Sequence, residues 1–132
     1  MRLLGIGVDV ADVGRVRRLL ERYPRFAERC FTPGERRYGL GRAHPEQSLA
    51  ARFAGKEAVM KSLGSDWRAI PWQDVEIIGG GAPRAVLRGR AAARAGELGV
   101  GEVLVTLSHT DGVAVAVAVA VSPVPASVPR PG

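Results

Sequence analysis

Hydrophobic positions along the chain follow two patterns, which predict a mixture of strands and helices. Short apolar or alternating runs predict strands, and apolar positions three and four residues apart predict helices. We expect strands at 3–10, 74–78, 84–88, 102–108 and 113–121, and helices at 13–23, 25–30, 33–40, 45–63 and 89–99. The helix at 45–63 is the longest, so the pattern predicts an α+β fold, with an antiparallel sheet packed around one long helix.

Cap and turn sequences support these boundaries. Asp12 can cap the first helix, and Thr32 with Glu35 forms a capping box at the start of the third. The segments 79–83 and 109–112 are turn sequences between predicted strands, and each predicts an antiparallel hairpin.

Charged residues interrupt apolar segments at two places. The first predicted strand is hydrophobic until Asp9. One face of the long helix is apolar except for a carboxylate and an ammonium, and it consists of Ala50, Phe53, Ala54, Glu57 and Lys61. Charges at core positions are costly unless they are paired or bound to an ion, so Asp9 and Glu57 predict a divalent-cation site. Two simpler explanations remain open: Glu57 and Lys61 can form an ordinary i,i+4 pair, and Asp9 can cap the following turn.

Composition limits the class of protein and its partners. The chain has 132 residues, a formal net charge of +6 and a pI of about 10.7, which favours an acidic partner such as nucleic acid, an anionic surface or an acidic protein. We expect one domain over 1–121 and a proline-rich, disordered tail over 122–132. The single cysteine, Cys30, and the lack of a signal peptide or of an apolar run long enough to span a bilayer favour a cytoplasmic protein.

Four short motifs occur in a characteristic order along the chain. They are GIGVD at 5–9, FTPGE at 31–35, RFAGKE at 52–57 followed by Lys61, and SHT at 108–110. In this order and spacing they resemble the signature of the holo-acyl-carrier-protein synthases, the small phosphopantetheinyl transferases. The resemblance runs from about Leu3 to about Val121, which is nearly the whole chain.

The resemblance implies an activity and a set of site residues. The implied reaction transfers 4′-phosphopantetheine from coenzyme A to a serine of an apo acyl carrier protein, with adenosine 3′,5′-bisphosphate as leaving group. Asp9 and Glu57 match the family's carboxylates for Mg²⁺, and Lys61 matches a lysine that contacts phosphate and offsets charge on the leaving group. The catalytic residues implied are therefore Asp9, Glu57 and Lys61. The coenzyme A site implied by the resemblance takes Arg52, Lys61, Pro83, His109 and Thr110.

The resemblance leaves the proton acceptor and the details of coenzyme A binding open. The attacking serine can lose its proton to Glu57, which we favour, to a metal-bound water, or less favourably to His109. Ala82 stands where the family usually has the lysine of a Gly-Lys-Pro run, directly before Pro83. Asp66 adds a negative charge near the anion site, so both positions put the fit of coenzyme A in doubt.

Arginines on and just after the first predicted helix suggest a docking surface. The resemblance implies that Arg15, Arg22 and Arg25 bind the acidic helix of the carrier protein, although a solvated polar face would also explain them. Small members of the family assemble as homotrimers with an active site at each subunit interface, so we expect a homotrimer. The strand at 113–121 is apolar on both faces, and we expect both faces to be buried, partly by a neighbour.

Two other functions compete with this interpretation. A small basic nucleic-acid-binding protein would fit the charge, but only 5% of the residues are aromatic and no base-stacking or groove-reading motif occurs. An inactive relative that acts as a carrier-binding module would not need Asp9, Glu57 and Lys61 intact. We therefore expect neither nucleic acid nor a membrane as a partner, and the carrier protein can belong to fatty-acid or polyketide synthesis.

Overall fold

The computed structural model describes residues 1–123, which form one antiparallel sheet and several helices. Along the chain the elements are β1 (Leu3–Asp12), α1 (Val13–Arg22), α2 (Phe26–Cys30), α3 (Pro33–Leu40), α4 (Pro45–Ser62), the 3₁₀ helix η1 (Trp72–Asp74), β2 (Val75–Ile78), β3 (Arg84–Leu87), α5 (Gly89–Leu98), β4 (Glu102–His109) and β5 (Val113–Val121). The sheet order is β1-β5-β4-β3-β2. The predicted α+β class is confirmed, and every predicted element is present with its ends shifted by at most two residues.

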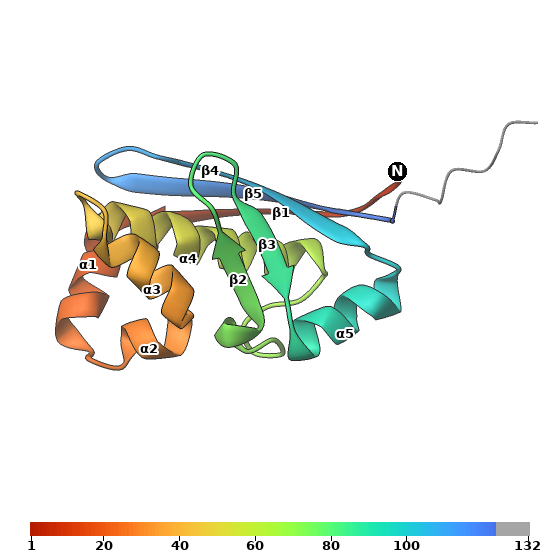
Figure 1. The fold of residues 1–132 in the computed structure, drawn as a ribbon, viewed down its shortest axis with the longest axis horizontal. Coiled ribbons are helices and arrows are strands. Elements are labelled where there is room, and N and C mark those ends of the chain that lie inside the picture. The colour runs from red at the N-terminus through yellow and green to blue at the C-terminus, as the bar shows by residue number, and fades with distance from the viewer. Residues whose placement is uncertain (124–132) are drawn as a thin grey trace, which may run out of the picture.

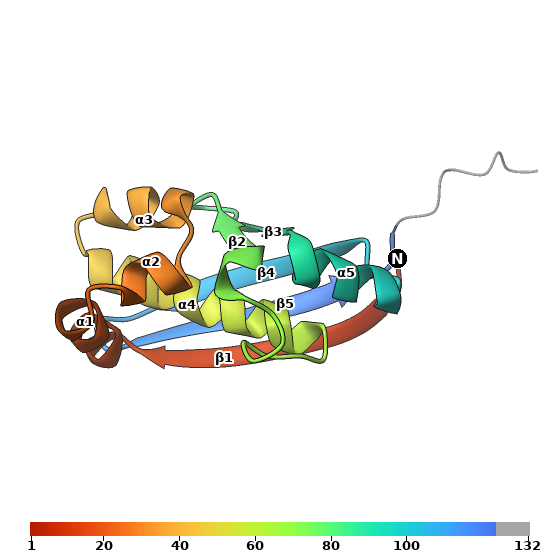
Figure 2. The ribbon, with the colours of Figure 1, turned by 90° about the horizontal axis from the view of Figure 1, so that it is seen from below.

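Helix α4 occupies the centre of the molecule. The long strands β1, β5 and β4 run along one side of α4, while α1, α3 and the β2–β3 hairpin pack on the other side (Figures 1 and 2). The hairpin joins β4 through a single residue pair, Arg84 with Leu104, which leaves β2 free to contact α4. Helix α4 is therefore enclosed on nearly every side. No helix within residues 1–123 is both long enough and apolar enough to cross a membrane.

Small residues allow α4 to lie directly on the sheet. A Cβ atom at Gly7 would collide with the carbonyl oxygen of Ala58, and a Cβ atom at Gly5 would collide with that of Ser62. The β5 residues that face the helix are also small and fully buried, and they are Ala114, Ala116, Ala118 and Ala120. Because side chains two apart on a strand share a face, Asp9 follows Gly5 and Gly7 on the side of β1 that touches α4.

The opposite face of the same sheet is apolar and exposed. Ile6, Val8 and Val10 of β1 keep 64%, 53% and 59% of their surface exposed, and Val113 of β5 keeps 41%. Within one chain the alanine side of the strand 113–121 is fully buried, whereas its valine side is exposed at Val113 and Val115 and only partly buried at Val117 and Val119, so full burial of that side would need a second chain. A contiguous exposed apolar patch of this kind marks an interaction surface.

The end of β5 is tied to the start of β1. The backbone N–H of Ser122 donates to the carbonyl oxygen of Arg2 at 2.9 Å, and the Ser122 hydroxyl accepts from the backbone N–H of Arg2 at 2.9 Å. The prediction that the disordered tail begins at Ser122 is therefore wrong for that residue. The rest of the predicted tail, from residue 124, lies outside the described residues.

Candidate active site

Asp9, Glu57 and Lys61 lie together between β1 and α4. The ammonium of Lys61 donates to Asp9 Oδ1 at 2.9 Å and to the carbonyl oxygen of Val8 at 3.2 Å. Glu57, one turn earlier on α4, shares a hydrogen bond with Asp9. The side chain of Asp9 is 13% exposed, but that of Lys61 is 48% exposed. The prediction of Lys61 at a core position is therefore wrong, because its long stem carries the ammonium to the surface.

The carboxyl group of Glu57 has a perturbed pKa. Burial raises the pKa of Glu57, and the charge of Asp9 and the hydrogen bond to it raise this pKa further, to about 7. Lys61 and Arg15 act in the opposite direction. The pKa of Lys61 is itself raised, chiefly by its hydrogen bond to Asp9. The Glu57 carboxyl group is therefore partly protonated at neutral pH, and a bound cation would take the place of that proton.

These side chains fit a hard divalent cation that has few protein ligands. Carboxylate oxygens suit Mg²⁺, which usually keeps several ligands from water or from substrate phosphates. Within residues 1–123 no group of three or more His, Cys, Asp or Glu side chains could hold a metal ion. Asp9 and Glu57 would thus hold Mg²⁺ only together with oxygen ligands from outside the chain.

A cleft of about 1260 Å³ opens beside the carboxyl pair. Asp9, Glu57 and Arg15 give one part of it charge, and aromatic side chains line another part. Among these, the rings of Phe53 and Trp72 stack with centroids 4.8 Å apart and planes at 20°. The sequence does not show this aromatic wall, because its members come from separate segments of the chain. The cleft can therefore take a ligand that is charged at one end and apolar at the other.

Arg52 and His109 line a different hollow, of about 510 Å³, which shares no residue with the cleft. Arg52 is only 2% exposed, and its Nη2 donates to the carbonyl oxygen of Gly79 at 2.7 Å. Its guanidinium carbon lies 3.8 Å from the centroid of the Tyr38 ring. The sequence analysis missed three further residues that line this hollow: Tyr38, Arg42 and His44. The hollow therefore has a basic lining that suits an anion.

The two remaining residues that the resemblance assigns to coenzyme A, Thr110 and Pro83, line neither the cleft nor this hollow. The hydroxyl of Thr110 accepts from the backbone N–H groups of Gly112 and Val113 at 3.3 and 3.2 Å, so it stabilises the β4–β5 turn. Pro83 lines a third hollow, of about 510 Å³, beside β3, α5 and β4. Within one chain, the predicted coenzyme A residues are thus distributed over several places and do not form one pocket.

The three arginines that the resemblance assigns to docking are exposed. Arg15 lines the cleft, Arg22 ends α1 and Arg25 precedes α2. Within the described part of the chain, none of them forms an ion pair. Arg29 and Arg68, which the sequence analysis did not single out, line the same cleft and extend this basic edge. Arg68 pairs with Asp66 at 3.1 Å, but Arg15, Arg22 and Arg25 have no such partner, and like charges without partners favour an acidic molecule at this surface.

Comparison with known proteins defines the class of this chain. A family model described as the 4′-phosphopantetheinyl transferase superfamily matches residues 5–118. The holo-[acyl-carrier-protein] synthase of Moorella thermoacetica is 49% identical over 116 residues, which cover 86% of this chain and 91% of that protein. The corresponding protein of Streptomyces avermitilis is 47% identical over 118 residues, with coverages of 88% and 95%. The chain therefore belongs to the holo-[acyl-carrier-protein] synthases within this superfamily, a family of transferases.

Solved structures of holo-[acyl-carrier-protein] synthases share the fold. The protein from Neisseria meningitidis matches with a TM-score of 0.81 at 28% identity and covers 91% of this chain and 99% of its own. The Helicobacter pylori protein, solved in complex with coenzyme A, matches with a TM-score of 0.76 at 26% identity, with coverages of 88% and 99%. The sheet packed around one long helix is therefore the architecture of the family.

Proposed function

We propose that this protein transfers the 4′-phosphopantetheine group of coenzyme A to a serine of an apo acyl carrier protein and releases adenosine 3′,5′-bisphosphate. The observation that carries the proposal is the convergence of Asp9, Glu57 and Lys61 beside the cleft. Relatives matched over most of the chain bear the name of this activity, and the Helicobacter pylori relative was solved with coenzyme A.

The proposed reaction exchanges one phosphorus–oxygen bond for another. The serine oxygen attacks the phosphorus that carries the pantetheine arm. The bond from that phosphorus to the bridging oxygen breaks, and its electron pair leaves with the nucleotide. Catalysis of such transfers depends mainly on positioning and on charge neutralisation. Asp9 and Glu57 would hold Mg²⁺, which would supply positive charge to offset that of the phosphates.

The chain's own residues account for the remaining requirements. Lys61 can turn from Asp9 toward the departing phosphate because its ammonium is half exposed on a flexible stem. Glu57 is the favoured proton acceptor, since it lines the cleft beside the expected position of the serine. His109 lies in the basic hollow, so within one chain it is remote from this carboxyl group. That separation disfavours the His109 of the same chain as the base.

We further propose a homotrimer whose active sites lie between chains. The basic hollow, lined by Arg52 and His109, and the cleft beside Asp9 and Glu57 share no residue in one chain. A single coenzyme A molecule would nevertheless need both. A neighbouring copy on the exposed face of Ile6, Val8 and Val10 would bury apolar surface and could bring the hollow of one chain to the cleft of another. A 14.0 kDa particle in sedimentation equilibrium at micromolar concentration would refute this assembly.

The proposed partner is an acidic carrier protein of fatty-acid or polyketide synthesis in the cytoplasm. The exposed, unpaired arginines Arg15, Arg22 and Arg25 support it, because they lie at the edge of the cleft and along the chain next to it. Docking by these charges would steer the carrier serine toward the carboxyl pair.

Intact-mass spectrometry of an apo carrier protein tests the proposed reaction. Incubation with the protein, coenzyme A and Mg²⁺ should add one phosphopantetheine arm, and EDTA or Glu57→Ala should abolish the addition. Glu97→Ala, which removes an exposed carboxylate of α5, is the matched control and should retain activity. No addition to any fatty-acid or polyketide carrier, together with no binding of coenzyme A in calorimetry, would overturn the proposal.

A further inference from the structure

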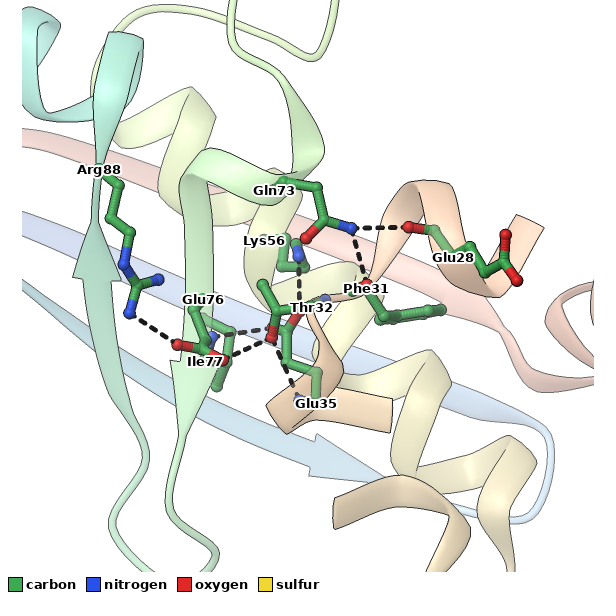
Figure 3. Close-up of polar contacts among 9 residues, drawn as sticks. All are labelled: Glu28, Phe31, Thr32, Glu35, Lys56, Gln73, Glu76, Ile77 and Arg88. Atoms are coloured by element: carbon green, nitrogen blue, oxygen red, sulfur yellow. Dashed lines mark hydrogen bonds and ion pairs between the residues drawn. The ribbon is translucent and has the colours of Figure 1, made fainter. Parts of the chain in front are cut away.

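A second carboxylate–ammonium pair involves α4, and the proposed reaction does not use it. The ammonium of Lys56 lies 2.6 Å from Glu35 Oε1 of α3, and both side chains are 0% exposed (Figure 3). Burying two charges costs hydration that their attraction often fails to recover, and apolar side chains of similar size are commonly as stable. A contribution to stability is therefore a weak explanation for this pair.

The Glu35 carboxylate connects three elements of the fold. Its Oε1 accepts from Lys56 of α4 and, at 2.9 Å, from the backbone N–H of Thr32. Its Oε2 accepts from the backbone N–H of Ile77 on β2 at 2.8 Å. The hydroxyl of Thr32 in turn donates to Glu76 of β2 (Figure 3). One side chain thus fixes α4 relative to α3 and β2 by directional hydrogen bonds.

Helix α4 carries two polar stripes that face different neighbours. Arg52 and Lys56, four residues apart, bind the carbonyl of Gly79 and the carboxylate of α3. Glu57 and Lys61, also four residues apart, face β1. Because consecutive helical residues are offset by about 100°, the direction of Lys56 determines the direction of Glu57.

The contact of α4 with the sheet specifies the rotation of the helix only weakly, although α4 also buries larger side chains such as Val59 and Met60. The contact between α4 and the sheet is made largely by small residues, such as Ala54 and Ala58 of the helix and Ala116 and Ala118 of β5. Small side chains interlock less than large ones, so they resist rotation less. A rotation of about 20° at a helix radius of about 2.3 Å would move a Cα atom by about 0.8 Å. Misplacement by about 1 Å can lower a rate by about 100-fold.

We propose that the buried Glu35–Lys56 pair positions the active site by setting the rotation of α4. With this pair formed, Glu57 meets Asp9 on one side of the helix, while Arg52 reaches the basic hollow on the other. Lys56 and Glu35 are then positioning residues that act through α4 without touching the substrate. The inference rests on the proposed function, since it treats Glu57 as a cation ligand.

The test removes the pair while keeping side-chain volume, in the variant Glu35→Gln/Lys56→Met. Folding is checked by circular dichroism, and Mn²⁺ affinity is measured by calorimetry on the protein without coenzyme A or carrier. We expect a folded protein whose Mn²⁺ affinity falls about tenfold and whose kcat falls about 10- to 100-fold. The KM for the carrier should stay within about twofold, because the docking arginines lie on other elements.

A core variant provides the matched control. Val59→Ala removes buried apolar volume from α4 without touching the pair, so it should lower the Tm but leave Mn²⁺ affinity and kcat close to wild type. A folded double variant with wild-type Mn²⁺ affinity and kcat would overturn the inference. So would equal losses of both quantities in Val59→Ala.

A second variant decides the question if the double variant does not fold. Glu35→Asp keeps the charge and shortens the side chain by one methylene, so weaker Mn²⁺ binding in the folded protein supports the inference and unchanged binding overturns it. Failure of the wild-type protein to modify any carrier would overturn the proposed function alone. The Mn²⁺ comparison needs neither carrier nor coenzyme A, and it therefore decides this inference independently.

Discussion

Helix α4 supplies the lysine of two carboxylate–ammonium pairs that differ in their environment. The Glu35–Lys56 pair is fully buried at 2.6 Å, whereas the Asp9–Lys61 pair, at 2.9 Å, has an ammonium that is half exposed. A buried partner that separates finds no water to replace the contact, so the first pair must stay formed in the folded protein. The second pair can open at little cost, because water or a phosphate can replace it. Burial, rather than residue type, therefore separates a structural pair from an exchangeable one.

The largest expected effect comes from removing one partner of the buried Glu35–Lys56 pair. Burial lowers the pKa of Lys56, and the Glu35 carboxylate counteracts this, so each charge depends on the other. Lys56→Ala leaves the Glu35 carboxylate buried without its cation, and we expect a loss of about 3 to 5 kcal/mol in the free energy of unfolding. Urea denaturation measures it. A loss below about 1 kcal/mol would show that water enters this site.

The Asp9–Lys61 pair, whose ammonium is half exposed, should give the opposite result. Lys61→Ala removes a cation from the expected path of the leaving group, so we expect kcat to fall about 100- to 1000-fold, which corresponds to about 2.7 to 4 kcal/mol. The free energy of unfolding should change by less than about 1 kcal/mol, since an exposed ion pair contributes little. The loss in kcat is measured by mass spectrometry of the carrier protein, and the loss in the free energy of unfolding is measured by urea denaturation. Losses of similar size in activity and stability would remove the proposed role of Lys61.

The same comparison shows which parts of the site the sequence could predict. Asp9 and Glu57 could be predicted because a carboxylate in an apolar strand or helix face is a local anomaly. Glu35 has a local explanation instead, since it completes the capping box with Thr32, and the structure confirms that box. Its other partners, Lys56 and Ile77, are 21 and 42 residues away, and no local pattern shows such contacts.

Other features depended on how separate elements meet. The two glycines before Asp9 show their purpose only when the backbone of α4 lies against β1. Helical periodicity placed Lys61 on the correct face, but it could not show that the stem carries the ammonium to solvent. The aromatic wall of the cleft joins Phe53 of α4 to Trp72 of η1, so only the packed fold shows it. Local patterns thus predicted the elements, and tertiary packing determined which charges are buried.

Charge reversal at the docking surface should have a smaller effect, confined to the carrier. In Arg15→Glu/Arg22→Glu, repulsion of an acidic carrier should raise its KM at least about tenfold, and the KM should become less sensitive to salt. The matched control is Arg84→Glu/Arg90→Glu, which changes the net charge equally at two exposed arginines of β3 and α5. An equal rise in KM in both variants would mean that only net charge matters, and no rise in either would refute the docking surface.

The smallest expected effect concerns the proton on Glu57. Folding raises the pKa of Glu57 from its ordinary value of 4.5 to about 7, so the folded protein favours the protonated carboxyl. The raised pKa of Glu57 therefore contributes to the free energy of unfolding. The contribution is present in full below pH 4.5 and is lost as the pH rises through about 7. Glu57→Gln keeps a neutral group at every pH. In EDTA at pH 8 the variant should therefore be more stable than wild type, by about 1 kcal/mol after allowance for solvent screening of a half-exposed group.

The pH dependence of this difference is the decisive measurement. Urea denaturation at pH 4.5 and pH 8 in EDTA should show a gap between variant and wild type only at the higher pH. Added Mg²⁺ should close the gap at pH 8 by stabilising wild type alone, because a ligand that binds only the folded state stabilises it. A gap of the same size at both pH values would mean that folding does not raise the pKa of Glu57. Asp9 and Lys61 would then form an ordinary surface ion pair. The difference between this pair and the buried Glu35–Lys56 pair would then be one of burial alone and would not indicate a cation site.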